Sequence, residues 1–329
     1  MTYPDDILRI IDLKTYFFTS NGIVKAVDGV NFTIPKGESV GLVGESGCGK
    51  TVTAYSTIQL VPTPPGRIVS GQIHFKGKDL LKLSKKKIQD VRGKEIAMVF
   101  QEPSSSMNPS FTIGNQMEEV IRFHQGGSSV QIRKKATDIL GAVRIPDPTR
   151  ILTQYPHELS GGMLQRVMIA MAVSCEPDLL ICDEPTTSLD VSMQAQVINL
   201  LNDLRRERGT SVLFITHDLG VLNWMCTYAA VMYAGKIVEQ ADIRNLLKNP
   251  LHPYTRTLMG ASPRLDRDSE MLDSIPGSVP NLINPPPGCR FHPRCAHTLS
   301  VCSREIPRLS EKNQGHWVAC FAESEGGET

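Results

Sequence analysis

Two short stretches of this chain carry glycines, a lysine and carboxylates at spacings that suit phosphate chemistry. The first is Gly44-Glu45-Ser46-Gly47-Cys48-Gly49-Lys50-Thr51, which fits the pattern G-x-x-x-x-G-K-[ST]. Its glycines let backbone N–H groups turn toward phosphate oxygens at the positive end of a following helix. Lys50 would hold the β- and γ-phosphates, and Thr51 would offer its hydroxyl to Mg²⁺. The loop is therefore predicted to bind a nucleotide, with Cys48 at a variable position.

The second stretch is an apolar run that ends in two carboxylates, Leu179-Leu180-Ile181-Cys182-Asp183-Glu184-Pro185. Asp183 is suited to Mg²⁺, which prefers hard oxygen ligands near phosphates. Glu184 is suited to polarise a water molecule that attacks the γ-phosphate. Together with the loop at 44–51, these carboxylates predict the hydrolysis of ATP.

Strands and helices must position these groups, and the hydrophobic pattern predicts where they lie. Strands are expected at residues 39–43, 96–100, 179–182 and 212–216, with helices at 51–60 and 191–208. Because strands alternate with helices, the fold class is predicted to be α/β with a largely parallel sheet. Residues 22–35 and 71–75 are instead typical of short antiparallel strands with turns.

The chain is predicted to contain two domains. Residues from about 104 to 171 are mostly helical and would form a subdomain inserted between core strands. After residue 250 prolines accumulate and the hydrophobic periodicity fades. We therefore expect an ATPase domain over residues 1–250 and a proline-rich, irregular C-terminal domain over residues 251–329.

Composition excludes several classes of function. The 329 residues carry a net charge of +1 and are 40% hydrophobic, which gives no electrostatic case for nucleic-acid binding. The apolar runs are shorter than the roughly 18 residues that span a bilayer, and the N-terminus lacks the features of a signal peptide. We expect a cytoplasmic protein, so that transport across a membrane would need other subunits.

The stretch Leu159-Ser160-Gly161-Gly162-Met163-Leu164-Gln165-Arg166 resembles the signature of the ATP-binding-cassette (ABC) family, the engines of ABC transporters. Three further landmarks look like those of the family and follow its order. Gln101 resembles the Q-loop glutamine, which touches Mg²⁺ and the attacking water. Ser188-Leu189-Asp190 resembles the D-loop, which lies at the dimer interface. His217 resembles the switch histidine, which contacts the γ-phosphate. Tyr16 is our choice for the aromatic that stacks on adenine, with neighbouring Phe17 as the alternative.

The resemblance covers residues 7–250 and implies a P-loop NTPase cassette, with a RecA-like core, an antiparallel β part and the inserted helical subdomain. It also implies that Ser160, Gly161 and Gly162 act on ATP bound by a second cassette subunit, a related chain or another copy of this one. ATP would then join two cassettes, and hydrolysis, with Glu184 and Gln101 placing the water, would release them. That cycle would drive two membrane permease subunits from the cytoplasmic face of the cell membrane, where this chain would be peripheral.

Four of the eight cysteines, Cys289, Cys295, Cys302 and Cys320, lie in the proline-rich segment. Disulfides are disfavoured in the cytoplasm, and four thiolates in a core-poor segment suit a metal that adds folding energy. Their spacing does not choose between Zn²⁺, an iron–sulfur cluster and free thiols. Rival ligands are His292, His297 and His316, whereas Cys175, Cys182 and Cys226 are interpreted as core residues.

The stretch Asn249-Pro250-Leu251-His252-Pro253-Tyr254-Thr255, together with the cysteine pattern, looks like the dipeptide/oligopeptide importer ATPases. This resemblance implies a [4Fe–4S] cluster on the four cysteines and an extracytoplasmic substrate-binding protein as a further partner. Import of nickel or another small solute remains an alternative, as does a soluble ABC ATPase without a transport role. A DNA-repair cassette is disfavoured because the chain lacks a long heptad coiled coil.

Overall fold

The chain folds as two units, residues 1–81 with 214–329, and residues 82–213. The computed structural model describes residues 5–187, 189–261 and 277–323. The division falls within strand β8 (Ser211–Thr216), whose six residues are all buried.

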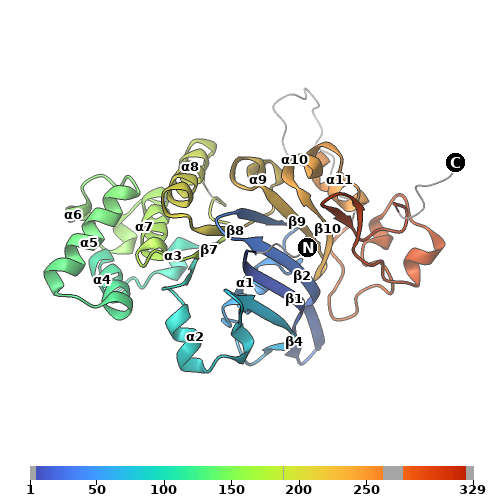
Figure 1. Cartoon of the computed structure of the whole chain (residues 1–329), viewed down its shortest axis with the longest axis horizontal. Coiled ribbons are helices and arrows are strands. Elements are labelled where there is room, and N and C mark those ends of the chain that lie inside the picture. Colours follow the sequence, from blue (N-terminus) through green and yellow to red (C-terminus); the bar gives the residue numbers. More distant parts are fainter. Residues whose placement is uncertain (1–4, 188, 262–276, 324–329) are drawn as a thin grey trace. The chain divides into compact units, whose positions relative to one another are not determined.

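An antiparallel sheet in the first unit has the strand order β2-β1-β4-β5 (Figure 1). Its strands are β1 (Asp6–Thr19), β2 (Gly22–Pro35), β4 (Gly66–Phe75) and β5 (Lys78–Asp79). The prediction of short strands with turns over residues 22–35 was wrong about strand length. One continuous strand of 14 residues, β2, occupies this range. Shifts of register between β1 and β2 mark bulges that let the two strands stay paired along their whole length.

A second group of strands in the same unit begins with β3 (Ser39–Val43), which is buried along its whole length, as its apolar run predicts. β3 lies parallel to β9 (Tyr228–Tyr233), and β9 pairs antiparallel with β10 (Lys236–Asp242). The C-terminal strands β12 (His316–Val318) and β11 (Ser310–Asn313) continue from the edge of β10. The helices of this unit are α1 (Lys50–Thr57), α9 (Leu219–Met225), α10 (Ile243–Lys248) and α11 (Pro253–Ala261).

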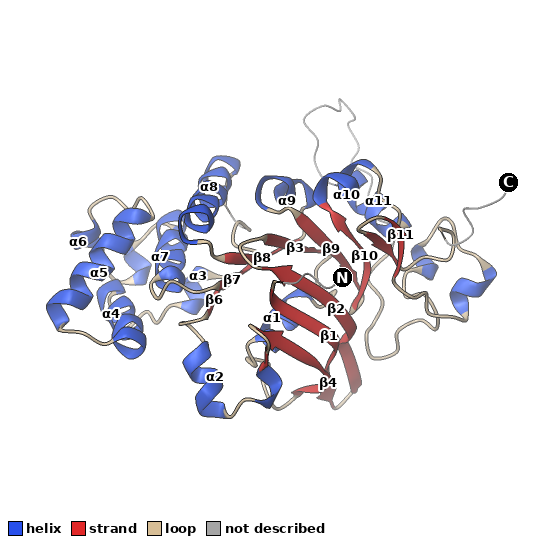
Figure 2. Cartoon of the chain, viewed as in Figure 1, coloured by secondary structure: helices blue, strands red, loops and turns tan. Residues whose placement is uncertain are grey.

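Helices dominate the second unit (Figure 2). Strands β6 (Ile96–Val99) and β7 (Leu179–Asp183) of this unit are parallel and pair from Ile96–Leu179 to Val99–Cys182. The helices are α2 (Lys85–Val91), α3 (Pro103–Ser106), α4 (Ile113–Gln125), α5 (Ser129–Ala142), α6 (Pro148–Ile151), α7 (Gly161–Val173) and α8 (Val191–Arg208). Side chains of Thr112, Ser128 and Asp190 accept backbone N–H bonds and so define where α4, α5 and α8 begin.

Candidate active site

The phosphate-binding loop follows β3 and leads into α1, as the sequence predicts. Gly49 caps α1 with φ of 110°, a conformation that side chains rarely adopt. A Cβ atom at Gly49 would lie 2.3 Å from the Ala26 carbonyl oxygen, and one at Gly44 would lie 2.1 Å from that of Met232. Glycine is therefore required at both positions by space, and at Gly49 by the backbone as well.

Lys50 is held by the loop itself. Its Nζ donates to the carbonyl oxygens of Gly44 at 2.7 Å and Glu45 at 3.1 Å, and the side chain is buried. The ammonium group is thus already placed among the backbone groups predicted to surround phosphates. Cys48 points into the core, where burial raises the pKa of its thiol.

Glu45 in the same loop is bound by residues from the C-terminal part of the chain, which sequence reasoning missed. Arg294 donates to both carboxylate oxygens of Glu45, at 2.8 and 3.1 Å. The backbone N–H of Glu45 donates to the hydroxyl of Tyr254 at 2.8 Å. Burial opposes the charge of Arg294, but its hydrogen bonds to Glu45 and Tyr233 outweigh burial and raise its pKa.

Tyr16, the predicted adenine contact, lies in a charged cluster. Its hydroxyl donates to Asp28 at 2.7 Å, and Asp28 also pairs with Lys236 at 3.6 Å and with the buried Arg290. Burial, then the Asp28 hydrogen bond, raise the pKa of Tyr16 to about 12. Burial opposes ionisation of Asp28, but Tyr16 and the cations together lower its pKa. The choice between Tyr16 and Phe17 stays a prediction, since both side chains are only partly buried.

In the second unit, the two carboxylates stand at the end of β7, and both are buried. Glu184 has φ of 47°, a left-handed conformation that is costly for this residue type and is found at functional sites. Its Oε2 accepts hydrogen bonds from Gln101 Nε2 at 3.2 Å and from Thr187 Oγ1 at 2.9 Å. The structure therefore brings Gln101 and Glu184 together, the two residues predicted to place the attacking water.

The signature stretch forms the start of α7. The Ser160 hydroxyl accepts the Met163 N–H at 3.4 Å as the helix cap, and both Ser160 and Gly161 are exposed. A Cβ at Gly161 would meet no described atom within 4 Å, whereas one at Gly162 would lie 2.3 Å from Met193 Cε. The open side of Ser160 and Gly161 leaves room for another molecule.

Two further landmarks also lie at the ends of strands or helices. His217 follows β8 and is exposed, and Asp218 after it caps α9 by accepting the Gly220 N–H at 2.7 Å. Asp190 of the predicted D-loop caps α8, but Ser188 lies outside the described residues. Both landmarks thus follow the strand or precede the helix next to which the sequence places them. The role of His217 stays a prediction.

The four C-terminal cysteines are not joined by disulfide bonds, and some of them affect the pKa values of others. Burial, with smaller contributions from Cys302 and Cys320, raises the pKa of Cys289 to about 11, and burial raises that of Cys320, with a contribution from Cys295. The Cys289 N–H donates to the Cys302 carbonyl at 2.8 Å. Even so, no group of three or more His, Cys, Asp or Glu in the described part of the chain could hold a metal ion. The metal-cluster prediction gains no support from this arrangement.

Two of the three histidines named as rival ligands have other partners, and the third, His297, is exposed. His316 Nε2 is bonded to the buried Glu239 at 2.7 Å, and His292 Nδ1 lies 2.8 Å from the Cys289 carbonyl oxygen. Cys175, Cys182 and Cys226 are buried, which confirms their interpretation as core residues.

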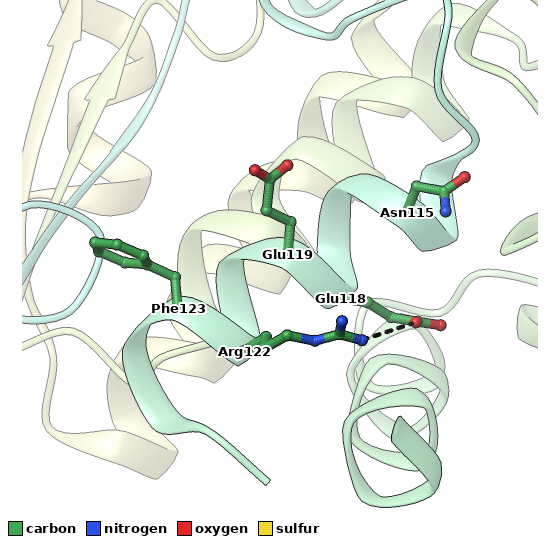
Figure 3. Close-up of a pocket in the computed structure, with 5 residues that line it drawn as sticks. All are labelled: Asn115, Glu118, Glu119, Arg122 and Phe123. Carbon is green, nitrogen blue, oxygen red and sulfur yellow. Dashed lines mark ion pairs between the residues drawn. The ribbon is translucent and has the colours of Figure 1, made fainter. Parts of the chain in front are cut away.

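A hollow of about 350 Å³ lies on α4, and none of the predicted ATP-binding residues lines it (Figure 3). Its lining residues are Asn115, Glu118, Glu119, Arg122 and Phe123. The ion pair of Arg122 with Glu118, at 4.0 Å, leaves a lining that is acidic overall, which disfavours phosphate. Among the described residues, no helix is both long and apolar enough to cross a membrane.

Comparisons with known proteins agree with these observations. The family profile described as ABC transporter matches residues 27–187, and that of the oligopeptide/dipeptide transporter C-terminal region matches residues 238–302. A probable peptide ABC transporter ATP-binding protein of Sinorhizobium fredii is 49% identical over 98% of this chain and 96% of its own. The dipeptide transport ATP-binding protein of Bacillus subtilis is 44% identical over 98% and 97%.

A solved structure also matches the fold. It is a dimeric ATP-binding cassette in a post-hydrolysis state bound to ADP and Pi, with a TM-score of 0.65 and 26% identity. The match covers 72% of this chain and 99% of that one. The predicted α/β cassette fold is therefore confirmed.

Proposed function

The chain belongs to the ATP-binding-cassette transporter family, in its oligopeptide and dipeptide transporter group, and we propose that it powers peptide import by hydrolysing ATP. One observation carries this proposal: the similarity to peptide-transport ATP-binding proteins extends over 98% of the chain. It therefore includes the C-terminal region that a cassette alone would not need.

ATP hydrolysis needs an in-line water, neutralised charge on the γ-phosphate and a group that orients or deprotonates the water. We assign the phosphates to the loop at 44–51, with Lys50 and His217 neutralising charge. Mg²⁺ is assigned to Thr51, Gln101 and Asp183, which supply hard oxygen ligands. The hydrogen bond of 3.2 Å between Gln101 and Glu184 supports their joint role in placing the water.

The signature is assigned to the ATP of a partner subunit. The exposure of Ser160 and Gly161 and the dimeric state of the solved cassette support this assignment. The partner cassette is either a related chain or a second copy of this one. Each chain would then contribute parts of two ATP sites, so that hydrolysis belongs to the assembled pair.

The remaining partners are two transmembrane permease subunits and an extracytoplasmic substrate-binding protein. In this assembly the chain would lie at the cytoplasmic face of the membrane, as a peripheral subunit. Closure and opening of the cassette pair would move the permeases between two orientations. Dipeptides or oligopeptides are the proposed cargo, because relatives from Bacillus subtilis are named as dipeptide and oligopeptide transport ATP-binding proteins.

A second proposal concerns Cys289, Cys295, Cys302 and Cys320, which we assign to a [4Fe–4S] cluster, with Zn²⁺ as the alternative. The basis of this assignment is the resemblance of the cysteine pattern to the importer ATPases, whose C-terminal-region profile matches residues 238–302. In the described structure the four thiols do not form a metal site. The proposed hydrolysis of ATP therefore involves no cluster. If bound, the metal would add folding energy to this segment. Anaerobically purified protein should contain iron and sulfide; zinc without iron would favour the alternative, and neither metal would refute both.

Uptake of a labelled dipeptide into liposomes that contain the permeases and both cassettes tests the main proposal. Lys50→Ala and Glu184→Gln should abolish ATP-dependent uptake, whereas Glu207→Gln, a matched change at an exposed carboxylate of α8, should not. Uptake that survives the first two changes would refute the proposal. Uptake of Ni²⁺ in place of the peptide would redirect it to another cargo.

A further inference from the structure

Two residues from the C-terminal part of the chain, Arg294 and Tyr254, form hydrogen bonds with Glu45 of the phosphate-binding loop. Arg294 binds the Glu45 carboxylate through two hydrogen bonds, at 2.8 and 3.1 Å, and Tyr254 accepts the Glu45 backbone N–H at 2.8 Å. Paired hydrogen bonds between a guanidinium and a carboxylate fix orientation as well as distance. Side chain and backbone of Glu45 are thus both held from outside the loop.

Arg294 and Tyr254 are themselves packed into the interior of the unit. The Arg294 side chain is only 6% exposed, and its guanidinium lies over the ring of Tyr233, 5.8 Å from the ring centre. Tyr254 is fully buried, with its ring centre 4.6 Å from that of Tyr233 and 5.4 Å from that of Phe291. A buried aromatic cluster therefore fixes both contacts before any ligand arrives.

This grip bears on ATP because Glu45 and Lys50 share the loop. Lys50 Nζ donates to the carbonyl oxygens of Gly44 and Glu45, so the position of residue 45 sets that of the ammonium group. A loop that is free to sample other conformations binds more weakly, in proportion to the fraction of time it spends in the competent one. Holding Glu45 raises that fraction.

We propose that Arg294 and Tyr254 are positioning residues for ATP, through which the C-terminal segment holds the phosphate-binding loop in its binding conformation. The inference rests on the proposed function, because it takes the loop to be the ATP site. Neither residue need touch the nucleotide. Their effect should appear in the affinity for ATP rather than in the chemical step.

Equilibrium binding of ATP to the full-length chain, measured calorimetrically with EDTA to prevent hydrolysis, tests the inference. Arg294→Gln and Glu45→Gln should each raise Kd about tenfold, the range expected when one charge-assisted pair is lost. The double variant should bind no more weakly than either single one, because both changes break the same pair. Tyr254→Phe, which removes only a hydroxyl, should raise Kd about threefold.

Arg256→Gln is the matched control, because it removes an exposed ion pair with Glu323 at 2.8 Å in the same region, and its Kd should be unchanged. Hydrogen exchange of the amides at 45–50 separates positioning from general destabilisation, since it should speed up in Arg294→Gln but not in Arg256→Gln. Arg294→Lys covers the case in which Arg294→Gln fails to fold, and should show a smaller rise in Kd.

Three outcomes separate this inference from the proposed function. Unchanged affinity in the Arg294 and Tyr254 variants, with binding lost in Lys50→Ala, would overturn the inference and leave the function standing. Additive effects of Arg294→Gln and Glu45→Gln would show that the pair does not act as a unit and would also overturn it. A wild-type chain that binds no ATP would overturn both.

Discussion

Lowering the pH should destabilise the first unit through His252, a buried histidine whose ring centre lies 5.7 Å from that of Phe291. The ring is 1% exposed, and its Nδ1 accepts the Tyr254 N–H at 3.0 Å, so the neutral form with a proton on Nε2 fits the site. Burial lowers the pKa of His252 to about 4 from the usual 6.5, and the nearby charge of Glu239 only partly opposes this. Protonation would remove the acceptor and place a charge in a dry environment.

The sign and size of the effect follow from this shift. Between pH 6.5 and about 4 the unfolded chain protonates His252 while the folded chain does not, so unfolding becomes easier as the pH falls. At about 1.36 kcal/mol per pKa unit, the full loss is about 3 kcal/mol, and about 2 kcal/mol of it is reached by pH 5. The contribution of this residue is complete only above pH 6.5.

Urea unfolding at pH 7.5 and at pH 5 measures the loss, with the fluorescence of Trp224 and Trp317, both in the first unit, as the signal. His252→Asn is the matched variant, because an amide oxygen can accept the Tyr254 N–H but does not titrate. The free energy of unfolding should fall between these pH values by about 2 kcal/mol more in the wild type than in the variant. Equal losses in both proteins would refute the assignment of a neutral, buried His252.

Three further predictions concern the ATP site and its supports. Glu184→Gln should lower kcat for ATP about 100-fold or more, because an amide cannot take the proton of the attacking water; phosphate release by the assembled importer measures kcat. ATP binding should persist, since the amide oxygen can still accept the two hydrogen bonds now made to Oε2. Gly49→Ala would force a Cβ to within 2.3 Å of the Ala26 oxygen, so calorimetry should detect no ATP binding. Asp28→Ala should destabilise the first unit by about 3–5 kcal/mol, measured by urea unfolding, because it leaves the buried Arg290 without its carboxylate.

Sequence reasoning succeeded where local rules decide the structure. The strand before the loop lies at Ser39–Val43 and the long helix at Val191–Arg208, both as predicted, because an uninterrupted apolar run and an aspartate cap define them. Helix α1 ends at Thr57, before the predicted end at Leu60, because Gln59 adopts φ of 53° and the Leu60 N–H bonds back to the Tyr55 carbonyl. The last turn thus depends on a local backbone conformation that hydrophobic spacing does not predict.

The contacts that hold the loop could not be predicted in this way. Glu45 and Arg294 are 249 positions apart in the chain, and no motif links them. Arg294 stood next to Cys295 in a pattern that was interpreted only through its cysteines. A bidentate ion pair of this kind depends on tertiary folding, which spacing rules do not describe. The glycine-lysine motif therefore located the loop, but no sequence pattern revealed the residues that hold it.

Two arginines next to C-terminal cysteines in the sequence form ion pairs with residues near the start of the chain, one of them in the ATP loop. Cys289 is followed by Arg290, which reaches Asp28, and Cys295 is preceded by Arg294, which reaches Glu45. The residues that carry these two ion pairs are thus direct neighbours of two of the four cysteines. The strand β12 pairs with β10 in the same unit, so the segment has a fixed support from which to act. The proposal that Arg294 and Tyr254 position the loop would thus give the C-terminal region a part in ATP binding.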